Sequence, residues 1–197
     1  MDRTRKANRT RVPTSTFRRT AVVAAVCALA ATTTGSAPVR AASGTALTCG
    51  ARTDPGQPIT LTPPLSMRRR AVTASGTFHL TDCSSPDRTQ SRLRSGRFSF
   101  HGTGQADCTG IYGVRGSATI TWYDRSGRRA GTSTLRPDNR PVNTYNPADA
   151  LLTGTVVRGV LAGARVTGSA VPTSDVTQCA TTGLRALNGW GKVTFTR

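Results

Sequence analysis

"GTFHLTDC", residues 76–83, and "GRFSFHG", residues 96–102, decide the fold class, because apolar and polar residues alternate in both. The three phenylalanines and Leu80 fall on a single face of their segments, and polar residues occupy the other face. Successive side chains of a β-strand point to opposite faces, so this alternation predicts half-buried strands.

The alternation extends into two further segments, "SATITWYD" (residues 117–124) and "GKVTFTR" (residues 191–197). Ile120 and Trp122 share one face of the first, and Phe195 shares a face with Val193 in the second. A helical period of 3.6 residues is convincing nowhere in the chain.

Turn-forming residues recur at short intervals between these segments. "LTGTVVRGVLAGARVTG", residues 152–168, is predicted to form a hairpin with Val156 and Val157 on one arm and Val166 on the other. Residues 137–147 contain three prolines and three asparagines and are expected to form a long loop. We therefore expect an all-β fold, an antiparallel barrel or sandwich of about eight to nine strands.

The N-terminal segment has the pattern of an export signal. An apolar run at residues 21–31 follows a stretch rich in Lys and Arg, and it is too short to span a hydrocarbon core of about 30 Å. Residues 39–41, Val-Arg-Ala, form a small-residue pattern of the kind that signal peptidase accepts. We expect a signal peptide over residues 1–41 and one secreted domain over residues 42–197, without a membrane span. Arg18-Arg19 leaves both the general (Sec) and the twin-arginine export routes open.

Four cysteines remain beyond the expected signal peptide: Cys49, Cys83, Cys108 and Cys179. An even number in an exported chain predicts two disulfides, and three pairings are open. A metal site fits less well, because no two of these cysteines have Cys-x-x-Cys spacing. No metal or other cofactor is expected.

Residues 42–197 are strongly basic, with nineteen Lys or Arg against eight Asp and no Glu, a net charge of +11. Such a surface favours an anionic partner, although GC-rich codon usage would also enrich arginine. The densest cluster, Arg68, Arg69 and Arg70, follows two prolines and is expected in a loop. With Trp122 and Tyr123 it forms the candidate binding surface. Nucleic acid is not favoured, because no stacking aromatics are interleaved with the arginines.

Residue types suited to catalysis are scarce. The absence of Glu and the presence of only two histidines argue against the paired carboxylates and triads of hydrolases, so no enzymatic activity is expected. His79 and His101 are expected to point outward, where neighbouring strands could bring them together. Asp82 and Asp107 each precede a cysteine, so a disulfide could bring them together, but turn capping or pairing with Arg is the favoured interpretation.

Two resemblances bear on function. "TWYDRSG", residues 121–127, resembles the Thr-Trp-Tyr start of an avidin-type barrel, which implies a small-molecule ligand in a barrel interior as an alternative function. Residues 152–197 resemble the ending of small exported actinobacterial proteins of unassigned activity. That resemblance rests on Thr153, Gly154, Val156, Gly159, Leu161, Gly163, Cys179, Thr181, Gly183, Leu184 and Phe195. It implies a fold and no chemistry.

The hypothesis from the sequence is an exported β-domain that acts as a binding or adaptor module. Its expected partner is another secreted protein or an anionic polymer of the cell wall, reached through a sheet edge or the Arg-rich loops. A subunit of a secreted umbrella-shaped toxin particle is a second alternative.

Overall fold

The computed structural model describes residues 44–54, 56–139, 141–143 and 152–197. The expected signal peptide lies outside the described residues, as do residues 140 and 144–147 of the expected loop. No described helix is both long and apolar enough to cross a membrane. The strands of the described part are β1 (Thr45–Thr53), β2 (Ile59–Leu65), β3 (Arg70–Ser84), β4 (Ser95–Asp107), β5 (Gly110–Tyr123), β6 (Arg129–Pro137), β7 (Val142–Asn143), β8 (Leu152–Gly159), β9 (Arg165–Pro172), β10 (Leu184–Leu187) and β11 (Gly189–Thr196).

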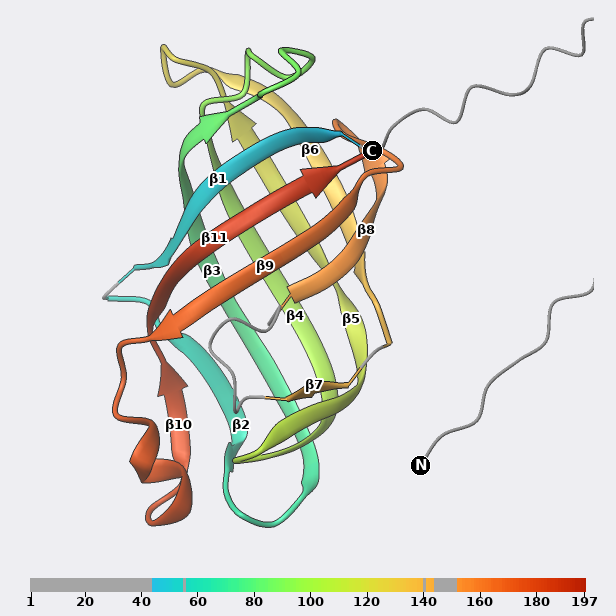
Figure 1. Cartoon of the computed structure of the whole chain (residues 1–197). Helices are drawn as coiled ribbons and strands as arrows, with labels where there is room; N and C mark the ends of the chain where they lie inside the picture. Colours follow the sequence, from blue (N-terminus) through green and yellow to red (C-terminus); the bar gives the residue numbers. More distant parts are fainter. Residues whose placement is uncertain (1–43, 55, 140, 144–151) are drawn as a thin grey trace, which may run out of the picture. The chain divides into compact units, whose positions relative to one another are not determined.

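Eight of these strands close into an antiparallel barrel (Figure 1). Around the barrel the order is β1, β3, β4, β5, β6, β8, β9 and β11, and β11 pairs with β1 to complete the ring. The predicted all-β fold is confirmed, and of its two forms the barrel is the correct one. Because the barrel is closed, each of these eight strands pairs with a neighbour on both edges over at least part of its length.

The two outer strands, β2 and β10, continue the sheet beyond the barrel. The C-terminal half of β3 pairs with β1, from Phe78 to Ser84, whereas its N-terminal half pairs with β2, from Thr73 to Ser75. β10 then pairs with the far edge of β2. One end of the barrel therefore carries a small extra sheet.

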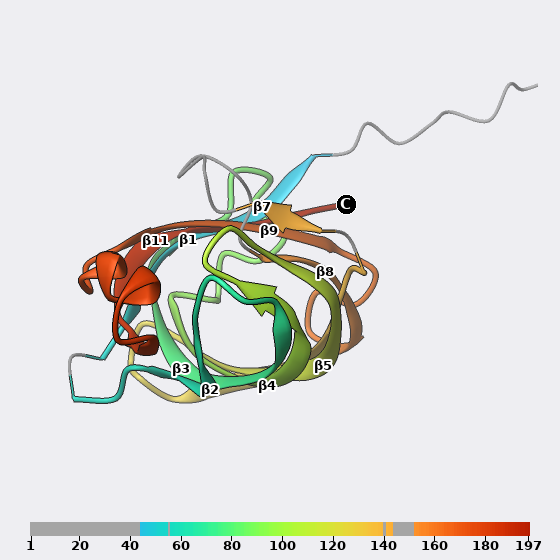
Figure 2. The ribbon, with the colours of Figure 1, turned by 90° about the horizontal axis from the view of Figure 1, so that it is seen from below.

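Alternating side chains fill the barrel interior, around which the strands form a ring in Figure 2. The largest completely buried hydrophobic side chains are Trp122, Phe98, Phe195, Leu47, Leu80, Ile120, Leu161, Val156 and Val166. An eight-stranded barrel is just wide enough for side chains to fill it. A second, smaller core of Leu61, Val72, Ala106, Cys179 and Leu184 lies under the outer strands.

The two predicted disulfides are present, and the structure decides their pairing. Cys49 of β1 joins Cys83 of β3, and Cys108 of the β4–β5 turn joins Cys179. Cys179 lies in a 3-10 helix, η1 (Val176–Ala180), which precedes β10. The second disulfide therefore ties the outer sheet to the barrel.

The local predictions agree with this fold. β8 and β9 form the predicted hairpin, in which Val156 and Val166 are buried and Val157 is exposed. The expected loop at residues 137–147 begins at the end of β6 and contains the two-residue strand β7, which pairs with β5 at Gly110 and Ile111.

Candidate functional site

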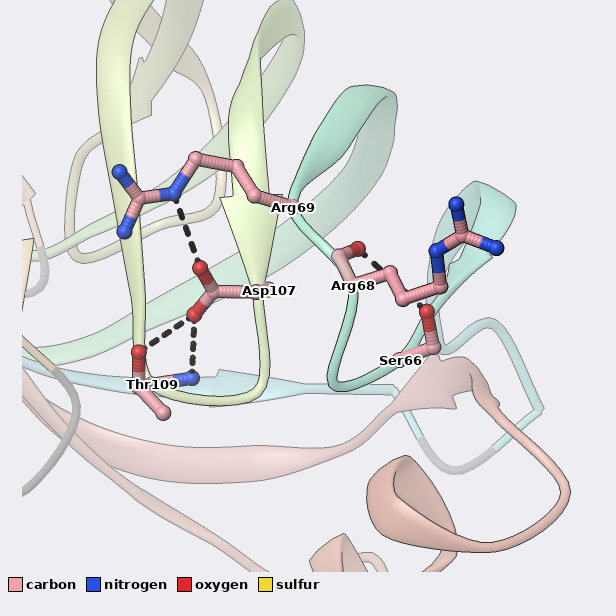
Figure 3. Close-up of polar contacts among 5 residues, drawn as sticks. All are labelled: Ser66, Arg68, Arg69, Asp107 and Thr109. Carbon is pink, nitrogen blue, oxygen red and sulfur yellow. Dashed lines mark hydrogen bonds and ion pairs between the residues drawn. The ribbon is translucent and has the colours of Figure 1, made fainter.

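The arginine cluster predicted to bind a ligand lies at the β2–β3 connection, and its middle member is held by the protein itself (Figure 3). Arg69 Nε donates a hydrogen bond to Asp107 Oδ2 at 2.9 Å. The Arg69 guanidinium also lies 3.8 Å from the centroid of the Tyr112 ring, a cation–π contact. Arg69 therefore pins the β2–β3 connection onto the β4–β5 hairpin.

Asp107 is the most deeply buried carboxylate among the described residues, with 7% of its surface exposed. It accepts hydrogen bonds from the Thr109 N–H at 2.8 Å and the Thr109 hydroxyl at 2.5 Å. These two bonds, with a smaller contribution from Arg69, lower the pKa of Asp107 to about 2. The same ion pair raises the pKa of Arg69. A carboxylate locked in its charged form suits turn capping and ion pairing, the favoured interpretation for this residue.

The remaining arginines of the cluster are not focused on a common point. Arg70 is the first residue of β3, and its guanidinium donates to the Pro64 carbonyl. Arg68 extends away from Arg69, and Ser66 donates its hydroxyl to the Arg68 carbonyl at 3.5 Å (Figure 3). The cluster is exposed as predicted, but two of its three guanidinium groups hold the fold together.

Trp122 does not belong to an exposed surface. It is completely buried, its indole N–H donates to Ser133 Oγ at 2.8 Å, and its ring packs edge-on against Phe195. Placing Trp122 in the candidate binding surface was therefore wrong. Strand alternation turns it inward, whereas the adjacent Tyr123 is half-buried.

The candidate catalytic residues do not converge. His101 of β4 pairs with Ser75 of β3, and Ser75 is four residues from His79 along β3. The two histidines are therefore about 13 Å apart along the strand direction. Asp82 lies near the C-terminal end of β3, whereas Asp107 follows Ala106, which pairs with Arg70 at the other end of β3. No disulfide joins them, because Cys83 and Cys108 belong to different disulfides. Over the described part of the chain, no group of three His, Cys, Asp or Glu side chains could hold a metal ion.

A different set of arginines meets at the opposite end of the barrel, at the top of Figure 1. Between the β3–β4 and β5–β6 connections lies a shallow hollow of about 320 Å³ that is wide open to the outside, which we term the arginine hollow. It is lined by Ser91, Arg92, Arg94, Asp124, Arg125, Ser126 and Arg128. An adjoining hollow of about 520 Å³ shares Arg94, Asp124 and Arg125 with it.

Sequence reasoning missed the arginine hollow, because its residues come from two turns that only the fold brings together. It also missed Trp190, which is 58% exposed. Trp190 on β11 lies beside Arg52 of β1 and Val171 of β9 on the outer face of the barrel. Counting back by two from the inward-facing Val193 and Phe195 would have placed Trp190 on the outer face.

A comparison with protein-family models, with curated proteins and with solved structures finds no match for this chain.

Proposed function

We propose that this protein is an exported, disulfide-bonded β-barrel that binds an anionic cell-wall polymer on its outer surface and performs no catalysis. The observation that carries the proposal is how few of the described arginines are paired with a carboxylate. Seventeen described residues are arginines, and only three of them, Arg69, Arg128 and Arg165, lie within 4 Å of a described Asp carboxylate. Most guanidinium groups are therefore available to an anion.

The packed interior supports a site on the outside. Trp122, Phe98 and Phe195 occupy the space in which a small ligand would bind, and both hollows described above open onto the surface. A small-molecule ligand inside the barrel would require these side chains to rearrange. Such repacking of a filled core is costly.

Export is supported by the two disulfides, because disulfides persist in oxidising compartments. It is also supported by the signal-peptide pattern at residues 1–41. An anionic polymer of the cell wall is a partner that an exported basic domain can reach.

A second candidate function is an adaptor for another secreted protein, and Trp190 favours it. Tryptophan and arginine are among the residue types that contribute most to protein–protein binding energy. The exposed Trp190 lies beside Arg52 and the 40% exposed Val171. A toxin-particle subunit would be one form of such an adaptor.

The test is to isolate the protein from the culture medium of cells that produce the full chain, at low and then high salt. Mass spectrometry would identify the mature N-terminus and everything that co-purifies. An anionic polymer released by salt supports the first function, because salt screens such contacts. A salt-resistant protein partner lost on Trp190→Ala supports the adaptor, and a protein that elutes alone and fails to bind isolated cell walls contradicts both.

A further inference from the structure

We propose that the arginine hollow is a binding site for the phosphate groups of a phosphodiester polymer. This inference rests on the proposed function, since it states where on the surface the anionic polymer binds and which chemical group is recognised. It replaces the Arg68–Arg70 cluster as the principal contact.

The first wall of the arginine hollow is held in place by the barrel. Arg92 and Arg94 are exposed and flank Leu93, which is buried in the main core, so both side chains project outward. The Arg94 N–H donates to the Tyr123 carbonyl at 2.9 Å, and its carbonyl accepts from the Cys83 N–H at 3.1 Å. The base of Arg94 is thereby fixed to both neighbouring strands.

The second wall is the β5–β6 turn, which carries Arg125 and Arg128. The Asp124 carboxylate organises this turn by accepting from the Ser126 N–H, the Ser126 hydroxyl and the Arg128 N–H at 2.9, 2.6 and 3.0 Å. The Gly127 N–H closes the turn onto the Asp124 carbonyl at 3.0 Å. Because the turn is preformed, little conformational entropy remains to be lost when a ligand orders it.

Charge in the arginine hollow is strongly unbalanced toward the positive. Four guanidinium groups line it against one carboxylate. That carboxylate lies 3.7 Å from Arg128 Nε and also accepts hydrogen bonds from its own turn, of which those from Ser126 and the Arg128 N–H lower the pKa of Asp124. No described carboxylate lies within 4 Å of the guanidinium groups of Arg92, Arg94 or Arg125.

Arginine in this arrangement matches phosphate. A planar guanidinium donates two parallel hydrogen bonds to a phosphate group, which makes it better suited than lysine to this role. The positive excess belongs to the arginine hollow alone, because the adjoining hollow sets Asp82 and Asp124 against Arg94 and Arg125. Neither lining contains an aromatic residue, so the phosphodiester backbone, and not a stacked base, is the feature recognised.

The experiment measures binding of fluorescent poly(glycerol phosphate) to the full chain, purified with both disulfides formed, over a range of salt concentrations. The site variant is Arg94→Gln/Arg125→Gln. The matched control, Arg115→Gln/Arg158→Gln, removes the same charge from exposed strand positions outside both hollows. We expect at least about a tenfold loss of affinity in the site variant, and a salt dependence shallower by about one unit of slope per lost phosphate contact. The control should lose less than about threefold.

Equal losses in the two variants would overturn the proposed site while leaving general polyanion binding intact. Failure of the unmodified protein to bind the polymer would overturn the proposed function as well. Tighter binding of a single-stranded oligonucleotide with the same number of phosphates would overturn the assignment to a base-free polymer.

A second measurement needs no variant. Saturating polymer should protect Arg94 and Arg125, but not Arg115 and Arg158, from modification by phenylglyoxal, as read by mass spectrometry of peptides. Uniform protection of all four would overturn the proposal.

Discussion

Replacing Ser133 with alanine tests whether Trp122 is a hydrogen-bonded anchor of the core. Both residues are completely buried, and the Trp122 indole N–H donates to Ser133 Oγ at 2.8 Å. The Ser133 hydroxyl in turn donates to the Val160 carbonyl. Alanine removes a single oxygen atom and leaves both the indole N–H and the carbonyl without this partner.

The expected loss of stability follows from the indole N–H and the carbonyl that lose this partner. A buried polar group that loses its hydrogen-bond partner costs about 1 to 3 kcal/mol, so two such groups predict a loss of about 3 kcal/mol in the free energy of unfolding. With a urea dependence of about 2 kcal/mol per molar, the unfolding midpoint should fall by about 1.5 M.

The assay is urea unfolding with both disulfides intact, followed by tryptophan fluorescence. Trp190→Phe serves as the background, because the exposed Trp190 would otherwise contribute emission that does not report on the core. Ser99→Ala is the control, since Ser99 is exposed and makes only a 3.3 Å contact between its hydroxyl and that of Thr77. The control should change stability by no more than about 0.5 kcal/mol.

A midpoint shift for Ser133→Ala no larger than that of Ser99→Ala would refute the reasoning. A double-mutant cycle isolates the bond itself. The cycle is followed by far-UV circular dichroism, because Trp122→Phe in the Trp190→Phe background leaves no tryptophan in the chain. In that background the indole N–H is already gone, so Ser133→Ala should cost about 1 kcal/mol less than in its presence. Equal costs in the two backgrounds would show that the bond contributes nothing to stability.

Three further predictions concern the fold and its pH dependence. Gly191→Ala places a Cβ 1.9 Å from the Ser169 carbonyl oxygen, so urea unfolding should show a loss of at least about 2 kcal/mol, whereas Gly56→Ala, whose Cβ would be 3.9 Å from its nearest neighbour, should be nearly neutral. Cys108→Ser/Cys179→Ser opens a loop of 71 residues, for which chain entropy predicts a loss of about 4 kcal/mol, and hydrogen exchange should rise first in β10. The folded state lowers the pKa of Asp107 from 3.8 to about 2, so its contribution is present above pH 4 and is lost as the pH falls through about 2. Unfolding midpoints measured between pH 5 and 2 should therefore fall less steeply for Asp107→Asn than for the unmodified protein, and parallel curves would contradict the assignment.

The strand pattern could be predicted because it is local. Alternation around Phe98, Ile120 and Phe195 requires only neighbouring residues, and all three are buried in the barrel. The same rule places Trp122 on the inward face with Ile120, and it would have identified Trp190 as a surface residue. Including Trp122 in the candidate binding surface conflicted with that alternation.

The candidate site could not be predicted in the same way. Arg69 was grouped with its sequence neighbours, but its actual partner, Asp107, lies 38 residues away on another hairpin. Arg92 and Arg94 meet Arg125 and Arg128 only because β4 and β5 pair in a register that places their connections at the same end of the barrel. Residue types can be read from a sequence, whereas which side chains come together depends on the register in which the strands pair.

The sequence by itself determined the all-β class, the inward and outward faces of the main strands, the basic surface and the presence of two disulfides. Each depends on residue type or on a period of two along the chain. Only the tertiary structure decided between barrel and sandwich, the pairing of Cys49 with Cys83 and of Cys108 with Cys179, and which arginines remain free to bind. The reason is that these depend on contacts between distant segments, such as the pairing of β1 with β11, and the alternation of a strand does not specify its neighbour.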